Sequence, residues 1–170
     1  VIMYPDNHYK SLVENKLRDL NLTSTRTFKY SSNPEVLTGE IENLTNYSQR
    51  KKNLELRKKM FEDKEDEQSL KQLERLEQLY TLGGVNFDSV IIIDFGNSLK
   101  SVLTSLAYTD VNQEKVLITT VNQWFDESIF YENTIKNLYY PSINYKEFKK
   151  YNNNYFKEFN SYPNEITILT

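Results

Sequence analysis

The stretch Ser89-Val90-Ile91-Ile92-Ile93-Asp94 decides the fold of this chain. Its run of β-branched residues between polar ones predicts a central strand within residues 87–94, buried on both faces of a parallel sheet. The polar turn Gly96-Asn97-Ser98 follows, and apolar residues then recur at helical spacing at Leu99, Val102, Leu103 and Leu106. The sequence therefore predicts a strand followed by a helix.

Further strands and helices flank this unit. Short strands are predicted at residues 1–4, 23–30, 115–119 and 137–140, with helices after the first two, the second capped by Ser31-Ser32-Asn33-Pro34. A last helix at residues 145–159 carries an aromatic stripe expected to lie in the core, formed by Tyr145, Phe148, Tyr151, Tyr155, Phe156 and Phe159. The alternation predicts an α/β fold, a Rossmann-like three-layer lobe with a mostly parallel five-stranded sheet.

Residues 46–82 interrupt this alternation. They are rich in Lys, Arg, Glu, Asp, Gln and Leu, and their apolar residues are spaced for one or two helices that end at Gly83-Gly84. Two interpretations remain open for this helical insertion. It is either a solvated helical hairpin laid on the lobe or a surface that docks on a partner protein.

Length and composition limit the class of protein. The 170 residues suit a single domain over residues 1–170, and the net charge of -3 argues against nucleic acid binding. No apolar run is long enough to span a bilayer, and the chain has no cysteine to form a disulfide or bind a metal. The opening Val1-Ile2-Met3-Tyr4 predicts a piece excised from a longer protein.

No enzyme motif is complete in this sequence. Asp94-Phe95-Gly96 matches the kinase magnesium-binding triplet, but no glycine-rich loop or His-Arg-Asp segment accompanies it. A phospho-receiver domain is a closer alternative, yet only Asp6 follows the first strand and no Lys closes the fifth. The single histidine, His8, excludes a multi-His metal site, so we predict no catalytic residues, metal or cofactor.

Ligands of open parallel sheets gather outside the carboxyl ends of the strands. Three loops follow such ends here, and they offer amides, hydroxyls, one carboxylate and aromatic rings. This set suits hydrogen bonding and stacking on a small polar ligand more than bond breaking. The predicted ligand-binding residues are Asn7, Tyr9, Asp94, Asn97, Thr120, Asn122, Gln123 and Trp124. For Trp124, burial under the edge of the lobe is the alternative.

Several segments together resemble a known family. They are Val1-Ile-Met-Tyr-Pro-Asp-Asn-His-Tyr9, residues 87–97, Val116-Leu-Ile-Thr-Thr120 with Trp124, and residues 148–163. The first segment, followed by a helix and the strand Thr25 to Tyr30, resembles the start of the second lobe of type I periplasmic solute-binding proteins of the leucine-binding kind. The three later segments look like the penicillin-binding-protein activator branch of that superfamily, and so do the inserted helices with residues 47–50.

The resemblance implies a binding site at matching positions. In leucine-binding relatives an aromatic residue after the first strand of this lobe contacts the ligand, and Tyr9 holds that place, although Lys10 replaces the usual glycine. The acidic residue that holds the ligand's amino group in those relatives is replaced by Val121-Asn122-Gln123-Trp124. An amino-acid ligand whose α-amino group lacks this carboxylate partner would lose a charge-assisted hydrogen bond, at a cost of about 1.5 to 3 kcal/mol.

Two functions follow from the resemblance, and neither needs catalysis. One is an envelope protein, periplasmic or anchored to the outer membrane as a lipoprotein, that activates a penicillin-binding protein, a cell-wall synthase. The other is the solute-binding receptor of an ABC transporter for amino acids or another small polar ligand, whose cleft is completed by a missing N-terminal lobe.

Overall fold

The computed structural model describes residues 1–23, 25–111, 113–121, 137–141 and 144–164. Within these residues the chain is an α/β protein with a five-stranded, all-parallel sheet. In chain order the elements are β1 Ile2–Pro5, α1 Lys10–Asp19, β2 Thr27–Tyr30, α2 Pro34–Leu44, α3 Tyr47–Glu62, α4 Glu67–Glu77, β3 Ser89–Ile92, α5 Gly96–Tyr108, β4 Leu117–Thr120, β5 Leu138–Tyr139 and α6 Tyr145–Phe159. The predicted fold class is confirmed.

The strands lie in the order β2-β1-β3-β4-β5, which places β3 at the centre of the sheet. Ile2 pairs with Ile91 of β3, and Ile91 pairs in turn with Thr119 of β4. The chain order reverses between β1 and β3, so the ends of these two strands form the topological switch point of the sheet.

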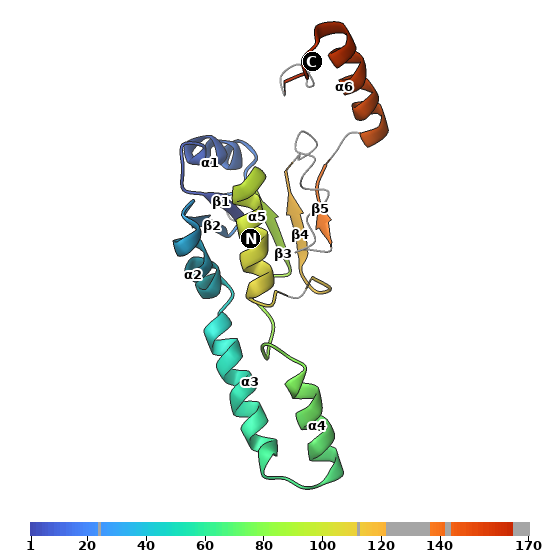
Figure 1. Cartoon of the computed structure of the whole chain (residues 1–170). Helices are drawn as coiled ribbons and strands as arrows, with labels where there is room; N and C mark the ends of the chain where they lie inside the picture. Colours follow the sequence, from blue (N-terminus) through green and yellow to red (C-terminus); the bar gives the residue numbers. More distant parts are fainter. Residues whose placement is uncertain (24, 112, 122–136, 142–143, 165–170) are drawn as a thin grey trace.

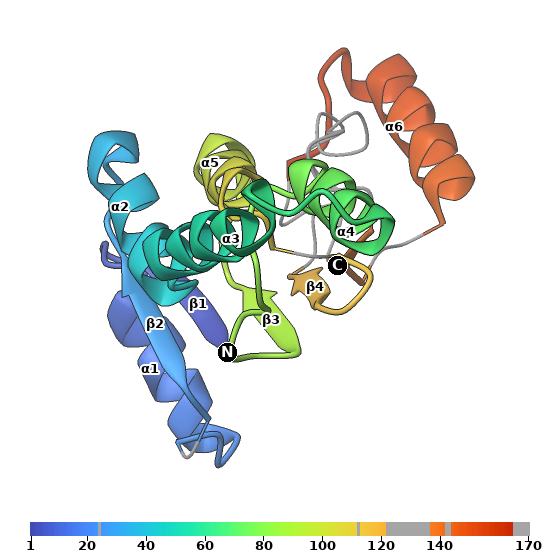
Figure 2. The same ribbon diagram turned by 90° about the horizontal axis from the view of Figure 1, so that it is seen from below.

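Helices cover the two faces unequally (Figure 2). On one face Met3, Val90, Ile92 and Ile118 join a large core with residues of α2 and α5. On the other face Ile2 and Tyr4 pack against Val13 and Leu17 of α1. The register determines this division, because residues paired across neighbouring parallel strands point to the same face.

The prediction that the central strand is buried on both faces is wrong at Ile91, which is 43% exposed. Ile91 points to the same face as Ile2, and the α1 cluster on that face holds residues of β1 with Ile93 packed against it. Leu117 of β4 and Tyr139 of β5 are also exposed. The β3–β4–β5 half of this face is thus open among the described residues.

The insertion at residues 46–82 forms the helical hairpin of α3 and α4, which extends from the amino-terminal side of the sheet (Figure 1). Only a narrow stripe of it is buried, including Leu54 and Leu76, while Leu56 and Met60 are exposed. Each helix of a two-helix hairpin contacts one neighbour, so a single stripe is the expected extent of burial.

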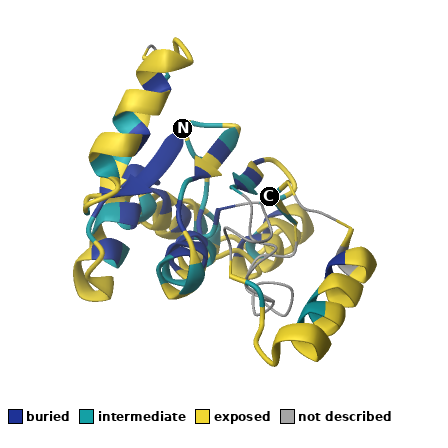
Figure 3. Cartoon of the chain, turned by 90° about the horizontal axis from the view of Figure 1, so that it is seen from above, coloured by how far each residue is buried: buried dark blue, intermediate teal, exposed yellow. Residues whose placement is uncertain are grey.

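The last helix, α6, has the predicted bounds and stands apart from the sheet beyond its carboxyl-terminal side (Figures 1 and 3). Its first turn is capped by Asn144, whose side chain accepts a hydrogen bond from the Lys146 amide at 3.0 Å. The aromatic stripe is only partly buried, since Phe148 is buried but Phe159 is 61% exposed. No helix in the described part of the chain is long and apolar enough to cross a membrane.

Candidate functional site

The carboxyl ends of β1, β3 and β4 bring part of the predicted site to one edge of the sheet. Asn7 and Tyr9 follow β1, Asp94 and Asn97 follow β3, and Thr120 ends β4. Since these three strands are neighbours and parallel, their carboxyl ends meet at one edge. The predicted Asn122, Gln123 and Trp124 lie outside the described residues.

Asp94 is the buried centre of this edge. Its Oδ2 accepts hydrogen bonds from the Tyr30 hydroxyl at 2.6 Å and from the Ser98 hydroxyl at 2.6 Å. Its Oδ1 accepts a hydrogen bond from the Phe95 amide at 2.8 Å. A carboxylate removed from water needs such donors, because an unpaired buried charge is very costly. These bonds join the ends of β2 and β3 to the first turn of α5.

The contact with Asp94 also affects the pKa of Tyr30. Burial raises the pKa of the Tyr30 phenol above its usual value, and the negative charge of Asp94 with their shared hydrogen bond raises it further. The phenol therefore stays protonated and donates to the carboxylate. Tyr30 was not predicted as a site residue, because it is 64 positions from Asp94 and only the strand order brings the two together.

Thr120 also has a structural partner. The Thr120 hydroxyl is buried and donates a hydrogen bond to the carbonyl oxygen of Ile92 at 2.7 Å. This bond adds a side-chain link between β4 and β3 beyond their backbone pairing. The hydroxyl of Thr120 thus holds the sheet together at this edge.

The exposed members of the predicted site lie at the starts of α1 and α5. Tyr9 is the N-cap of α1, and its ring lies beside His8 with 3.9 Å between ring centroids. The Asn7 side chain accepts a hydrogen bond from the Tyr9 amide at 2.9 Å. Asn97 is exposed in the first turn of α5. Tyr9 and Asn97 are therefore the described residues of the site with side chains open to a ligand.

A second buried charge, not predicted from the sequence, lies at the opposite edge of the sheet. Arg50, in the first turn of α3, is 6% exposed. Its guanidinium donates to the carbonyl oxygens of Gly83 at 3.0 Å, Thr109 at 2.9 Å and Asp110 at 2.7 Å, and to the Thr81 hydroxyl at 2.7 Å. One side chain thus joins the hairpin, the loop before β3 and the end of α5.

The electrostatics of this second site are those of a cation at a helix C-terminus. Burial lowers the pKa of Arg50, while the nearby charge of Asp110 opposes that shift. The Asp110 carboxylate lies 3.8 Å from the guanidinium and accepts a 2.5 Å hydrogen bond from Thr81. Asp110 has a φ of 55° and directly follows the C-cap of α5, where the left-handed conformation commonly ends a helix.

The same edge of the sheet is hollowed. A cavity of about 740 Å³ is lined by Arg50 and Asp110 together with the loop before β3 and the start of β4. Its apolar lining includes Leu79, Leu82 and Phe87. The Arg50 guanidinium is already bonded to four protein groups, so it serves as a wall of this cavity and not as a free anion-binding group.

Comparison with known proteins gives no match: no protein-family model, no curated protein and no solved structure matches this chain. The functional argument therefore depends on the residues and geometry described above. Among the described residues, no cluster of His, Asp or Glu is arranged to hold a metal ion.

Proposed function

We propose that this chain is a non-enzymatic binding lobe that acts by docking on a partner protein through the α3–α4 hairpin. Following the family resemblance, the partner would be a cell-wall synthase of the penicillin-binding type, and the full protein would act in the bacterial envelope. The observation that carries this proposal is the anchoring of the hairpin by the buried Arg50 network. A surface held in this way stays preorganised for binding.

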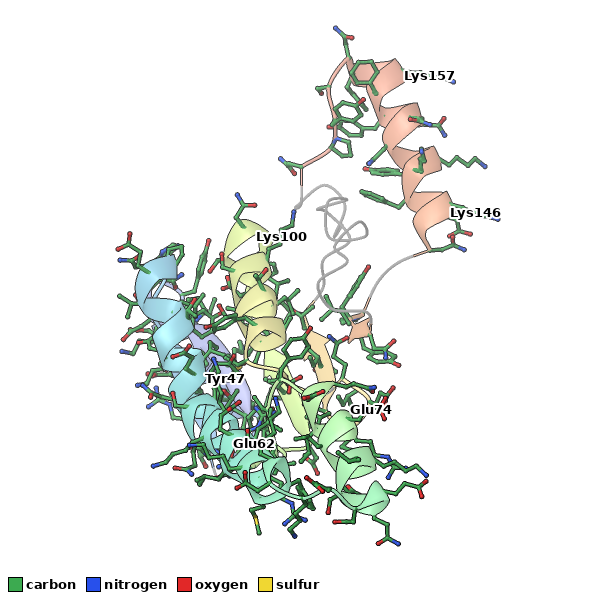
Figure 4. All side chains as sticks on the ribbon, turned by 60° about the horizontal axis from the view of Figure 1, so that its bottom comes forward. Tyr47, Glu62, Glu74, Lys100, Lys146 and Lys157 are labelled. Carbon is green, nitrogen blue, oxygen red and sulfur yellow. The ribbon has the colours of Figure 1, made fainter. Side chains whose placement is uncertain are left out.

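The exposed surface of the hairpin also supports docking. Leu56 and Met60 of α3 and Leu70 of α4 are large apolar side chains exposed to solvent among many charges. Basic residues outnumber acidic ones in α3, whereas acidic residues outnumber basic ones in α4. Apolar anchors surrounded by charges of both signs are common in protein interfaces, where the charges orient the partner. The side chains of the hairpin are visible in Figure 4.

The test replaces the apolar anchors without touching Arg50. In the full-length protein we expect the triple variant Leu56→Ser, Met60→Ser and Leu70→Ser to lose binding to the synthase and its activation. The control replaces Leu12 and Leu20 of the α1 segment with Ser, since both are exposed apolar residues and α1 lies at the other end of the lobe from the hairpin (Figure 1). Equal loss in both proteins, or retained activation in the triple variant, would reject the proposal.

A second candidate function is a solute-binding lobe that closes on a small polar ligand. It is supported by Tyr9 and Asn97, which are open to solvent at the switch point of the sheet. The test is thermal denaturation of the full-length protein with amino acids, peptides and cell-wall fragments, because a ligand of the native state raises the midpoint. A shift that disappears in Tyr9→Ala would support this function, and no shift with any compound would exclude it for that set.

A further inference from the structure

On one face of the sheet, the strands β3, β4 and β5 expose large apolar or aromatic side chains. We call the side chains of Ile91, Leu117 and Tyr139 the open sheet face; they are 43%, 49% and 57% exposed. Strand pairing and alternation place all three on the same side of the sheet as α1. Parallel sheets are normally covered on both faces, so this surface is the exception in the fold.

The aromatic stripe of α6 has the chemistry to cover it. Tyr151, Tyr155 and Phe159 are spaced four residues apart, and their rings lie 6.0 Å and 4.5 Å from one another in sequence order. Lys146 and Lys157 lie on the side of the helix that faces away from the rest of the chain (Figure 4), and Lys149 and Lys150 belong to the same basic side. Such a helix is built to place aromatic rings on a protein surface and ammonium groups in water.

The connection and the length of α6 also fit. Residues 140–144 join the end of β5 to the start of α6, a length typical of connections between a strand and the next helix. A helix of 15 residues is about 22 Å long, and the four residues of β4 span about 13 Å. A helix that returns from the carboxyl edge can therefore cross the whole open sheet face.

We infer that α6 is the cover of the open sheet face in a closed form of this chain. In that form the stripe of Tyr151, Tyr155 and Phe159 packs on Ile91, Leu117 and Tyr139, beside α1. The occupant is α6 of the same molecule, because the short connection keeps its effective concentration far above that of a second copy. The closed form has helices on both faces of β3 and β4.

Crosslinking tests this inference cleanly, because the natural chain has no cysteine. Leu117→Cys with Tyr155→Cys is treated with a short bismaleimide in the otherwise unchanged full chain. We expect an intrachain crosslink, visible as a monomer that joins the two corresponding proteolytic fragments. The control pair, Leu117→Cys with Lys150→Cys, places the second thiol on the basic side of α6 and is expected to crosslink several-fold less.

The crosslinking results distinguish docking of α6 on its own sheet from the alternatives. An intrachain crosslink in the first pair, well above the control pair, supports the inference. A crosslinked dimer shows that α6 covers a second copy and overturns it, and equal yields in both pairs show that α6 does not dock by its stripe. If the first pair does not fold by circular dichroism, Tyr139→Cys with Tyr151→Cys replaces it, since Tyr139 is exposed.

Discussion

In the part of the chain that the structure describes, each of the two edges of the sheet has one buried charged side chain, and α5 runs between them. At the carboxyl edge, Asp94 accepts hydrogen bonds from the Tyr30 hydroxyl at the end of β2 and from the Ser98 hydroxyl and Phe95 amide at the start of α5. At the amino edge, Arg50 donates to the Thr109 and Asp110 carbonyl oxygens at the end of α5. An anion at a helix N-terminus and a cation at its C-terminus both suit the helix dipole.

The origin of the two charges differs, and that difference is informative. Asp94 lies just after β3 in the lobe, whereas Arg50 comes from the insertion and reaches the lobe through backbone carbonyls of two other segments. The hairpin is therefore part of the folded lobe at its base, although most of its length is exposed. The carboxylate at the predicted ligand site, by contrast, is already used to hold strands and helix together.

The largest expected effect is the loss of the buried cation. Arg50→Met should destabilise the chain by about 3 to 5 kcal/mol, because it leaves buried carbonyl oxygens without donors and Asp110 without its cation. Urea unfolding measures the change. Arg57→Met on the same helix is the control, since Arg57 is exposed and its guanidinium lies over the Phe61 ring at 5.1 Å and donates to the Met60 sulfur at 3.8 Å. A loss for Arg50→Met no larger than for the control would contradict the structural role.

The next effect concerns the buried anion. Asp94→Asn should destabilise the chain by about 2 to 3 kcal/mol, because two short hydroxyl bonds then end on a neutral amide. The exposed Asp88, on the loop before β3, provides the control Asp88→Asn, with an expected change near zero. If instead Asp94→Asn is neutral while ligand binding by the full protein is lost, Asp94 acts on a ligand and not on the fold.

Tyr30→Phe should lower the free energy of unfolding by about 1 to 2 kcal/mol at neutral pH and change its dependence on pH in alkaline solution. Because the pKa of Tyr30 is raised on folding, the folded state holds the phenolic proton more tightly than the unfolded state. Stability from this group is fully present below the usual tyrosine pKa of 10.0 and falls as the pH rises above it. In urea unfolding at neutral and alkaline pH, the free energy of unfolding should decline less steeply with pH in the variant. Parallel declines in the two proteins would contradict a link between the Tyr30 proton and stability.

The smallest expected effect is the interaction between the two charges. The α5 helix has 13 residues and is about 20 Å long, so Arg50→Met and Asp94→Asn are expected to add within about 0.5 kcal/mol. A double-mutant cycle in urea measures the difference. A coupling clearly above that value would show that the two edges respond as one unit through α5.

Local patterns in the sequence predicted the elements well. The bounds of α6, the capping of α2 within Ser31-Ser32-Asn33-Pro34 and the central place of β3 all follow from signals within a few residues. The extent of burial was less predictable, because the exposure of Ile91 depends on which helix covers which part of the sheet. A β-branched run is compatible with burial on one face as well as on two.

The sites show the same limit. Asp94 and Thr120 were predicted at the right edge, but as ligand contacts, whereas both side chains bond to the protein itself. Arg50 stands in a segment full of basic residues, and nothing in the sequence separates it from Lys51 or Lys52. Its role comes from partners up to 60 positions away, which only the tertiary structure brings to it.

The position of Arg50 also determines where the hairpin is attached to the lobe. The α3 helix has 16 residues and is about 24 Å long, and Arg50 lies in its first turn. The hairpin is thus tied to the carboxyl end of α5 at its base, and a force applied at its far tip would act on these Arg50 hydrogen bonds. A partner that binds the tip would therefore act on the lobe at the base of the hairpin, far from the binding surface.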